Sequence, residues 1–277
     1  MLVFAAVIAG AGYWALERVQ RAKSAARQSL EFRMAGIVSS RGKTEIACET
    51  VVAGKPVVLL ALGQSNAANH GTRDGPSPEV TLIDDERCVI AGDPLPGGTG
   101  DGGSIWSRLP GQMRAAGLKR PVVLSVLAVD ATTIADWTAA DSPLVARLKR
   151  RIDTLRALGA QPTLILWQQG EADAKRGTSE MDYLASLQAL DRNLTAFGVG
   201  APVLLARSTS CRSRPDERIR RALDQAIALN SRFGQGPDTD ALPEQTMRRD
   251  SCHLNADGLG AAAALWAPIV LSRSLGA

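Results

Sequence analysis

The sequence is poor in the residues that several kinds of functional site require. Only two of the 277 residues are histidines, none of the four cysteines lies in a C-x-x-C pair, and aromatic residues make up 4% of the chain. Zinc sites use closely spaced Cys and His ligands, and surfaces that stack nucleic-acid bases use aromatic side chains. We therefore expect no metal site and no nucleic-acid binding, and we expect the basic residues behind the net charge of +4 to lie on solvated helix faces.

The chain also lacks an apolar run long enough to cross a bilayer. Residues 2–16 are apolar and uncharged, whereas a membrane-spanning helix needs about 20 apolar residues. The segment is typical of a signal-peptide core or a short membrane anchor, with Ala9-Gly10-Ala11 as a candidate cleavage site. No basic residue precedes it and several follow it from Arg18 onward, which by the positive-inside rule favours a cytoplasmic location for the rest of the chain.

The four cysteines bear on this conflict between an exported and a cytoplasmic protein. An even number of cysteines behind an apolar leader is typical of two disulfide bonds formed in an oxidising compartment. Four buried free thiols are the alternative. We favour an exported protein, periplasmic or extracellular, with residues 2–16 as a candidate membrane tether.

Short apolar runs alternate with longer helical patterns over most of the chain. The apolar runs are continuous and rich in β-branched residues, as is typical of strands buried on both faces of a parallel sheet. They lie at residues 56–62, 121–127, 162–167 and 202–206. The helical patterns begin at Ser142-Pro143, which forms a capped helix start before Gly159, and recur at residues 178–197, 215–230 and 256–274.

This alternation predicts a three-layer α/β/α sandwich with a doubly wound parallel sheet. We expect an apolar leader or short anchor at residues 1–16, a helical or linker segment at residues 17–50, and one catalytic domain at residues 51–277. Ligands of such folds bind beyond the carboxyl ends of the strands. Polar motifs at those strand ends are therefore the candidates for a functional site.

The first such motif, Gly63-Gln64-Ser65-Asn66, directly follows the first predicted strand. Backbone N–H groups on a tight turn before a helix can hold an oxyanion, which makes Ser65 a candidate nucleophile. Serine is also a common helix cap, so this motif alone leaves both interpretations open. The G-x-S-x-G elbow of α/β-hydrolases is excluded because residue 67 is alanine.

The second motif, Trp167-Gln168-Gln169-Gly170-Glu171, follows the third predicted strand. Its side-chain amides and carboxylate lie where the strand leaves the sheet, so they are candidates for a hydrogen bond to a substrate oxygen. A polar loop whose glutamines bond to backbone groups is the alternative.

The third motif, Asp250-Ser251-Cys252-His253, precedes the last predicted helix. A turn of this spacing lets Asp250 accept the Nδ1 proton of His253, which leaves Nε2 free to take a proton from a serine hydroxyl. His70 is a rival base. A residue in the helix that follows the nucleophile, however, points away from the serine hydroxyl more often than towards it.

In this order along the chain, the three motifs resemble the sequence blocks of SGNH (GDSL-like) hydrolases, and more closely those of the sialate O-acetylesterase and acetylxylan esterase branch. The resemblance covers roughly Pro56 to Ile269. It implies a flavodoxin-like α/β/α sandwich that hydrolyses O-acyl, typically O-acetyl, esters. The implied substrate is an acetylated saccharide or another small ester, and no metal or other cofactor is implied. Acyl transfer to a glycan and non-catalytic carbohydrate binding are the alternatives.

The resemblance also implies a role for each motif residue. Ser65 is the expected nucleophile, His253 its base, and Asp250 the group that orients the base. The expected oxyanion hole uses the Ser65 N–H, the Gly103 N–H and the side-chain amide of Gln169. The other motif residues expected at the oxyanion hole or the substrate are Gln64, Asn66 and Glu171.

The chain departs from the family pattern at one further block. Relatives often carry Gly-Gly-Thr or Gly-Gly-Ser before Ile and Trp, whereas this chain has Asp130-Ala131-Thr132-Thr133. The larger side chains put the substrate class in question more than the chemistry. Cys252, beside His253, is a candidate disulfide partner of Cys211, and Cys48 is a candidate partner of Cys88.

Overall fold

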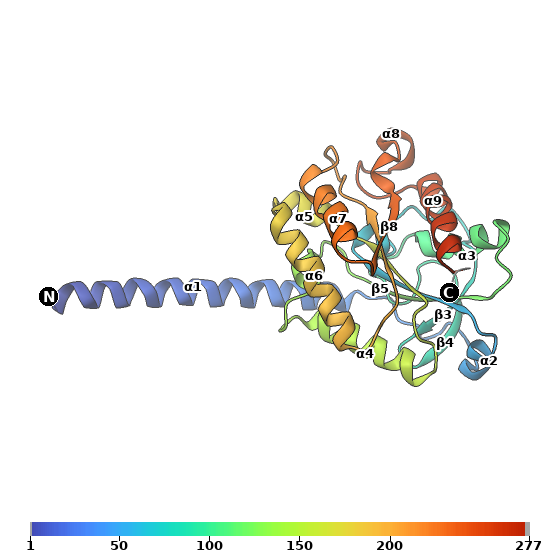
Figure 1. The fold of residues 1–277 in the computed structure, drawn as a ribbon, viewed down its shortest axis with the longest axis horizontal. Coiled ribbons are helices and arrows are strands. Elements are labelled where there is room, and N and C mark those ends of the chain that lie inside the picture. Colours follow the sequence, from blue (N-terminus) through green and yellow to red (C-terminus); the bar gives the residue numbers. More distant parts are fainter. Residues whose placement is uncertain (1, 275–277) are drawn as a thin grey trace.

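A computed structural model describes residues 2–274 of the chain, with side chains for residues 17, 18 and 20–274. Figure 1 shows an α/β body from which one long helix, α1, projects. The strands are β1 (Thr44–Ile46), β2 (Val57–Gly63), β3 (Val80–Asp84), β4 (Arg87–Ala91), β5 (Val122–Ala128), β6 (Leu164–Gln168), β7 (Val203–Arg207) and β8 (Phe233–Asp238). The α-helices are α1 (Leu2–Ala35), α2 (Cys48–Ala53), α3 (Ile105–Ala115), α4 (Pro143–Ala157), α5 (Glu171–Arg176), α6 (Glu180–Ala196), α7 (Glu217–Leu229), α8 (Glu244–Met247) and α9 (Ala256–Ser274). Short 3₁₀ helices are η1 (Ser65–Ala67), η2 (Ile134–Trp137) and η3 (Thr239–Ala241).

The strands form one sheet in the order β1-β4-β3-β5-β2-β6-β7-β8. All neighbours from β3 to β8 across this order are parallel, whereas β4 pairs antiparallel with both β3 and β1. The five strands β5-β2-β6-β7-β8 reproduce the 2-1-3-4-5 order of flavodoxin-like sheets. This confirms the predicted doubly wound fold.

Helices cover both faces of the sheet (Figure 1). Helices α4, α6 and α7 share one buried apolar cluster with Leu60 of β2, and α3 and α9 share a second cluster with its neighbour Leu59. Successive side chains of a strand point to opposite faces, so both residues are buried only because both faces are covered. The continuous apolar runs of the sequence have this origin.

The four predicted strands form β2, β5, β6 and β7, and the four predicted helices form α4, α6, α7 and α9. Both predicted disulfides are confirmed, Cys48 with Cys88 and Cys211 with Cys252. The first ties the start of α2 to β4. Because β1 pairs with β4, the sheet already begins within residues 17–50, the segment expected to be helical or a linker.

No helix among the described residues is long and apolar enough to cross a membrane. The backbone of residues 2–16 belongs to α1, but their side chains lie outside the described part of the structure. The assignment of residues 1–16 as a leader or anchor, and the domain boundaries based on it, therefore stay predictions.

Candidate active site

The sheet brings the predicted motifs together at its carboxyl edge. Gly63, the last residue of β2, pairs with Ala128 of β5 and Gln168 of β6, so the segments that follow these three strands leave the sheet side by side. Strand order reverses at β2, which is where doubly wound folds form a ligand crevice. Ser65 opens η1 directly beyond this point.

Gly63 makes the turn into Ser65 possible. Its φ is 150°, and a Cβ added to it would lie 2.0 Å from the carbonyl oxygen of Gln168. Any other residue would therefore push β2 away from β6 just before the candidate nucleophile. The glycine of the Gly-Gln-Ser-Asn motif has this steric role.

Ser65 and His253 line the same cavity, which has a volume of about 1160 Å³. Ser65 is buried, with 5% of its surface exposed, and lies in the wall of this cavity. Gln64, His70, Ala131 and Glu171 line it as well. Residues from the loops after β2, β5 and β6 thus meet the loop before α9.

Asp250 fixes the orientation of the His253 ring. Its Oδ2 lies 2.8 Å from Nδ1 of His253, and its Oδ1 accepts the backbone N–H groups of Cys252 and His253. Partial burial raises the pKa of Asp250, but these hydrogen bonds from the side chain and backbone of His253 outweigh it and lower the pKa to about 2. Asp250 is therefore ionised near neutral pH, which favours the His253 tautomer with the proton on Nδ1 and a free Nε2.

The rival histidine also lies in the cavity. The rings of His70 and His253 stack with centroids 5.5 Å apart, and Nε2 of His70 lies 3.2 Å from Oγ1 of Thr99. Burial lowers the pKa of His70, an effect that the carboxylate of Asp130 opposes and the nearby His253 reinforces. His70 makes no hydrogen bond to a carboxylate among the described residues, so it lacks the partner that orients His253.

Asn66 and Glu171 connect the site elements instead of facing a ligand as a pair. Nδ2 of Asn66 donates to Oε1 of Glu171 at 2.7 Å and to the carbonyl oxygen of Cys252 at 3.3 Å. Ser208 also donates to Oε1 of Glu171, while Oε2 is buried and has no hydrogen-bond partner among the described residues. Burial outweighs these hydrogen bonds and raises the pKa of Glu171 to about 7. Asn66 therefore links Cys252, the residue before His253, to Glu171 at the start of α5.

The side chain of Gln169 is fully buried, and its amide forms hydrogen bonds to other protein groups. Its Nε2 donates to the carbonyl oxygen of Thr132 and to Asp173, and its Oε1 accepts the hydroxyl of Tyr183. Gln64 turns its Oε1 towards the start of α5, where it accepts the Ala172 N–H at 3.1 Å. The structure therefore brings Gln64 to the cavity but not the amide of Gln169.

Gly103 does not reach the cavity either. Its N–H donates to the carbonyl oxygen of Gly71 at 2.8 Å, in a bridge between two loops. By contrast, the N–H groups of Ser65 and Ala131 have no hydrogen-bond partner among the described residues, and both residues line the cavity. The sequence showed Ala131 only as a departure from a glycine-containing block, and its φ of 52° is the left-handed conformation that glycine adopts without strain.

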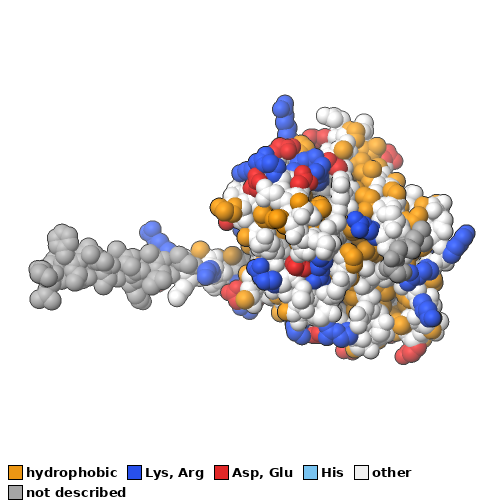
Figure 2. All heavy atoms as spheres, viewed as in Figure 1, with side chains coloured by type: hydrophobic (Ala, Val, Ile, Leu, Met, Phe, Trp, Pro, Cys, Tyr) orange, Lys and Arg blue, Asp and Glu red, His pale blue; other side chains and the backbone are white. Residues whose placement is uncertain are grey.

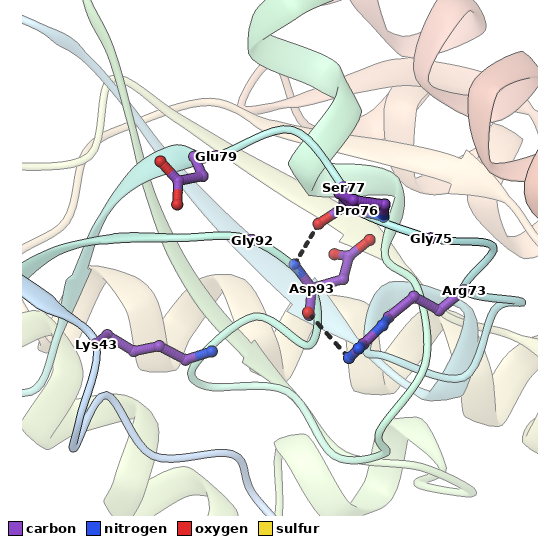
Figure 3. A pocket seen from close by; sticks show the side chains of 8 residues that line it. All are labelled: Lys43, Arg73, Gly75, Pro76, Ser77, Glu79, Gly92 and Asp93. Carbon is purple, nitrogen blue, oxygen red and sulfur yellow. Dashed lines mark hydrogen bonds between the residues drawn. The ribbon is translucent and has the colours of Figure 1, made fainter.

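A second cavity, of about 530 Å³, opens beside β4. Figure 3 shows Arg73 donating to the carbonyl oxygen of Asp93, whose N–H donates to Ser77. None of the described residues that line it is a histidine, so Ser77 has no base there. In the described part of the chain, no group of three His, Cys, Asp or Glu side chains is arranged to hold a metal ion.

Comparison with solved structures identifies the fold class. A protein from Arabidopsis thaliana superposes with a TM-score of 0.64 at 19% identity, covering 78% of this chain and 98% of its own. NanS and a family 3 carbohydrate esterase from Clostridium thermocellum each have a TM-score of 0.52 at 13% identity, and they cover 79% and 80% of this chain and 98% and 100% of their own. The chain therefore has the same α/β fold as these three proteins. No protein-family model and no curated protein sequence matches it.

Proposed function

We propose that the protein is a serine esterase that hydrolyses O-acyl esters, with an O-acetylated saccharide as its substrate class. The observation that carries this proposal is the meeting of Ser65 with the Asp250–His253 pair in one cavity at the carboxyl edge of the sheet. The saccharide part of the proposal is supported by the carbohydrate esterase among the proteins of similar fold.

In the proposed reaction, Nε2 of His253 takes the proton of the Ser65 hydroxyl as Oγ attacks the ester carbonyl carbon. The resulting tetrahedral intermediate loses its alcohol, which receives that proton from His253, and an acyl-enzyme remains. Water then attacks the acyl group with His253 as base, and release of the carboxylic acid restores Ser65. Asp250 stabilises the imidazolium in both steps because it accepts the Nδ1 proton.

For the oxyanion hole we propose the N–H groups of Ser65 and Ala131. Both groups are free of other hydrogen bonds within the described residues, and they stand at the ends of the neighbouring strands β2 and β5. Gln169 supports this hole indirectly, because its amide bonds the carbonyl oxygen of Thr132 and so helps to fix the loop that carries Ala131. Removing one such donor costs about 3 kcal/mol of transition-state stabilisation in characterised hydrolases.

We also propose that the protein works outside the cytoplasm, with residues 2–16 as its tether. The two disulfides support export, because structural disulfides persist in oxidising compartments. The catalytic domain at residues 51–277 would then be joined to the tether through the rest of α1 and β1.

Labelling with a fluorophosphonate tests the nucleophile directly, because the reagent phosphonylates an activated serine. We expect one adduct, mapped to Ser65 by peptide mass spectrometry, together with hydrolysis of p-nitrophenyl acetate by the same preparation. Ser65→Ala should lose both. An adduct on another serine, or full esterase activity in Ser65→Ala, would exclude the proposed nucleophile.

A further inference from the structure

Basic side chains surround the cavity that holds Ser65. They come from the end of α1, from α5, from the loop after β7 and from the start of α7. In Figure 2, Lys and Arg side chains gather over the end of the molecule where Figure 1 labels α5 and α7. The basic lining residues are Arg33, Lys175, Arg176, Arg212, Arg214 and Arg218.

Most of these cations have no carboxylate partner. Only Arg218 forms an ion pair, with Asp216; the other five make none within the described part of the chain. Nε of Arg33 is buried and has no hydrogen-bond partner among the residues that the structure describes. This cluster of positive charges is not neutralised by carboxylates of the described residues, and it therefore attracts anions.

The acidic lining residues do not cancel this charge. Asp216 forms an ion pair with Arg218, and Oε1 of Glu217 lies 3.6 Å from Nε of Arg220. The pKa of Glu171 is raised by burial to about 7, so this carboxyl group is partly neutral near that pH. Asp130 is the remaining carboxylate among the described lining residues, which leaves the cavity with an excess of positive charge.

Given the proposed esterase function, on which this inference rests, we infer that the substrate carries a negative charge on its alcohol part. An acetyl group is uncharged, so the charge that the basic cluster recognises must belong to the saccharide. A carboxylate or a phosphate group on the sugar has the required chemistry, and Arg binds both through paired N–H donors. The natural ester is therefore an acylated acidic saccharide instead of a neutral one.

Three acetylated probes of matched size test this inference in the full chain: an acetylated methyl glucoside, the corresponding methyl glucuronoside, and the corresponding glucose phosphate. At low salt we expect kcat/KM for at least one anionic probe to exceed that for the neutral probe about tenfold. Raising the NaCl concentration from about 0.02 to about 0.5 M should remove most of this preference, because salt screens exposed charges. The two anionic probes distinguish a carboxylate from a phosphate.

Charge-reversal variants locate the effect. Arg176→Glu and Arg214→Glu, both at exposed positions, should each lower the ratio of anionic to neutral kcat/KM about threefold to tenfold. The control is Arg150→Glu, an exposed position on α4 outside the cavity, which should leave the ratio unchanged. A wild-type enzyme that cleaves p-nitrophenyl acetate and all three probes equally well would overturn the inference while leaving the esterase function intact. Absence of any ester hydrolysis would overturn both.

Discussion

His70 and His253 stack in the cavity with ring centroids 5.5 Å apart and an angle of 28° between the ring planes. The two rings are not equivalent, because His253 forms a hydrogen bond with Asp250, whereas His70 forms one with Thr99. Burial lowers the pKa of His70, which favours its neutral form when His253 becomes an imidazolium. A second positive charge at this distance would oppose that step. His70 can thus share the cavity without competing for the proton.

Replacing each histidine separately with glutamine distinguishes the proposed base, His253, from its neighbour His70. His253→Gln should lower kcat/KM for p-nitrophenyl acetate by at least about 10³, because the variant lacks the proposed base. His70→Gln keeps a group that can bond to Thr99 and should change kcat/KM by less than about tenfold. Steady-state kinetics at pH 7.5, with circular dichroism to check folding, decides the matter. A large loss in His70→Gln, with kcat/KM of His253→Gln unchanged, would make His70 the base.

Asp250→Asn is expected to lower kcat by about 10² to 10⁴ with little change in KM, because an amide in place of the carboxylate no longer selects the reactive tautomer of His253. Asp257→Asn is the control, since Asp257 is an exposed acidic residue at the start of α9. The pKa of Asp250 is lowered to about 2, so Asp250 stays ionised and its titration should not appear in the wild-type kcat/KM profile above about pH 4. Wild-type kinetics in Asp250→Asn would exclude the triad.

The sequence predicted the centre of the fold well because burial on both faces leaves a strong local signal. Leu59 and Leu60 point into different cores, and the run to which they belong reads as a buried strand. β8 gave no such signal. Within the described part of the chain it is an edge strand that pairs only with β7, and its sequence, Phe233–Asp238, contains two glycines and a proline. Such a strand forms because a neighbour provides hydrogen bonds, which local sequence does not reveal.

For the candidate site as well, the sequence predicted local contacts but not contacts between distant elements. Asp250 and His253 are three residues apart, so their hydrogen bond is a local feature. The amide of Gln169 is different, because its partners Thr132 and Tyr183 come from other elements. Motif position alone does not show whether such an amide faces the substrate or the interior. The free N–H of Ala131 is likewise visible only in three dimensions.

Glu171 should make stability fall as the pH rises. Its pKa is raised from 4.5 to about 7 by burial, so between these values the folded protein binds more protons than the unfolded chain. The stabilisation is complete below pH 4.5 and is lost as the pH rises through 7, amounting to about 3 kcal/mol. Glu171→Gln keeps an oxygen for Asn66 and Ser208 and removes the titration.

Urea unfolding at about pH 5 and about pH 8.5 measures this effect, with the variant as the reference for all other titrating groups. The wild-type free energy of unfolding should drop more than that of Glu171→Gln over this interval, by an amount of order 3 kcal/mol. The same pH dependence in both proteins would mean that Glu171 is not a buried, protonated acid in the folded state.

The two disulfides form a matched pair for the last test, because they close loops of nearly equal length, with sequence separations of 40 and 41 residues. By chain entropy, each bond is expected to stabilise the fold by up to about 4 kcal/mol. Only one of them lies at the site: Cys211 and Cys252 both line the cavity, and Cys252 precedes His253. Removing either bond should therefore cost similar stability but have different effects on catalysis.

We expect the double variant Cys211→Ala with Cys252→Ala to lose about tenfold or more in kcat for p-nitrophenyl acetate, because the loop that carries Asp250 and His253 loses its link to the loop after β7. Cys48→Ala with Cys88→Ala should keep wild-type kcat at a temperature where both variants are folded. Urea unfolding of the two variants supplies the stability comparison. If both variants lose kcat equally, the bond at the cavity stabilises the fold without positioning His253. If neither loses kcat, the hydrogen bond from Asn66 to the carbonyl oxygen of Cys252 is enough to hold the catalytic loop in place.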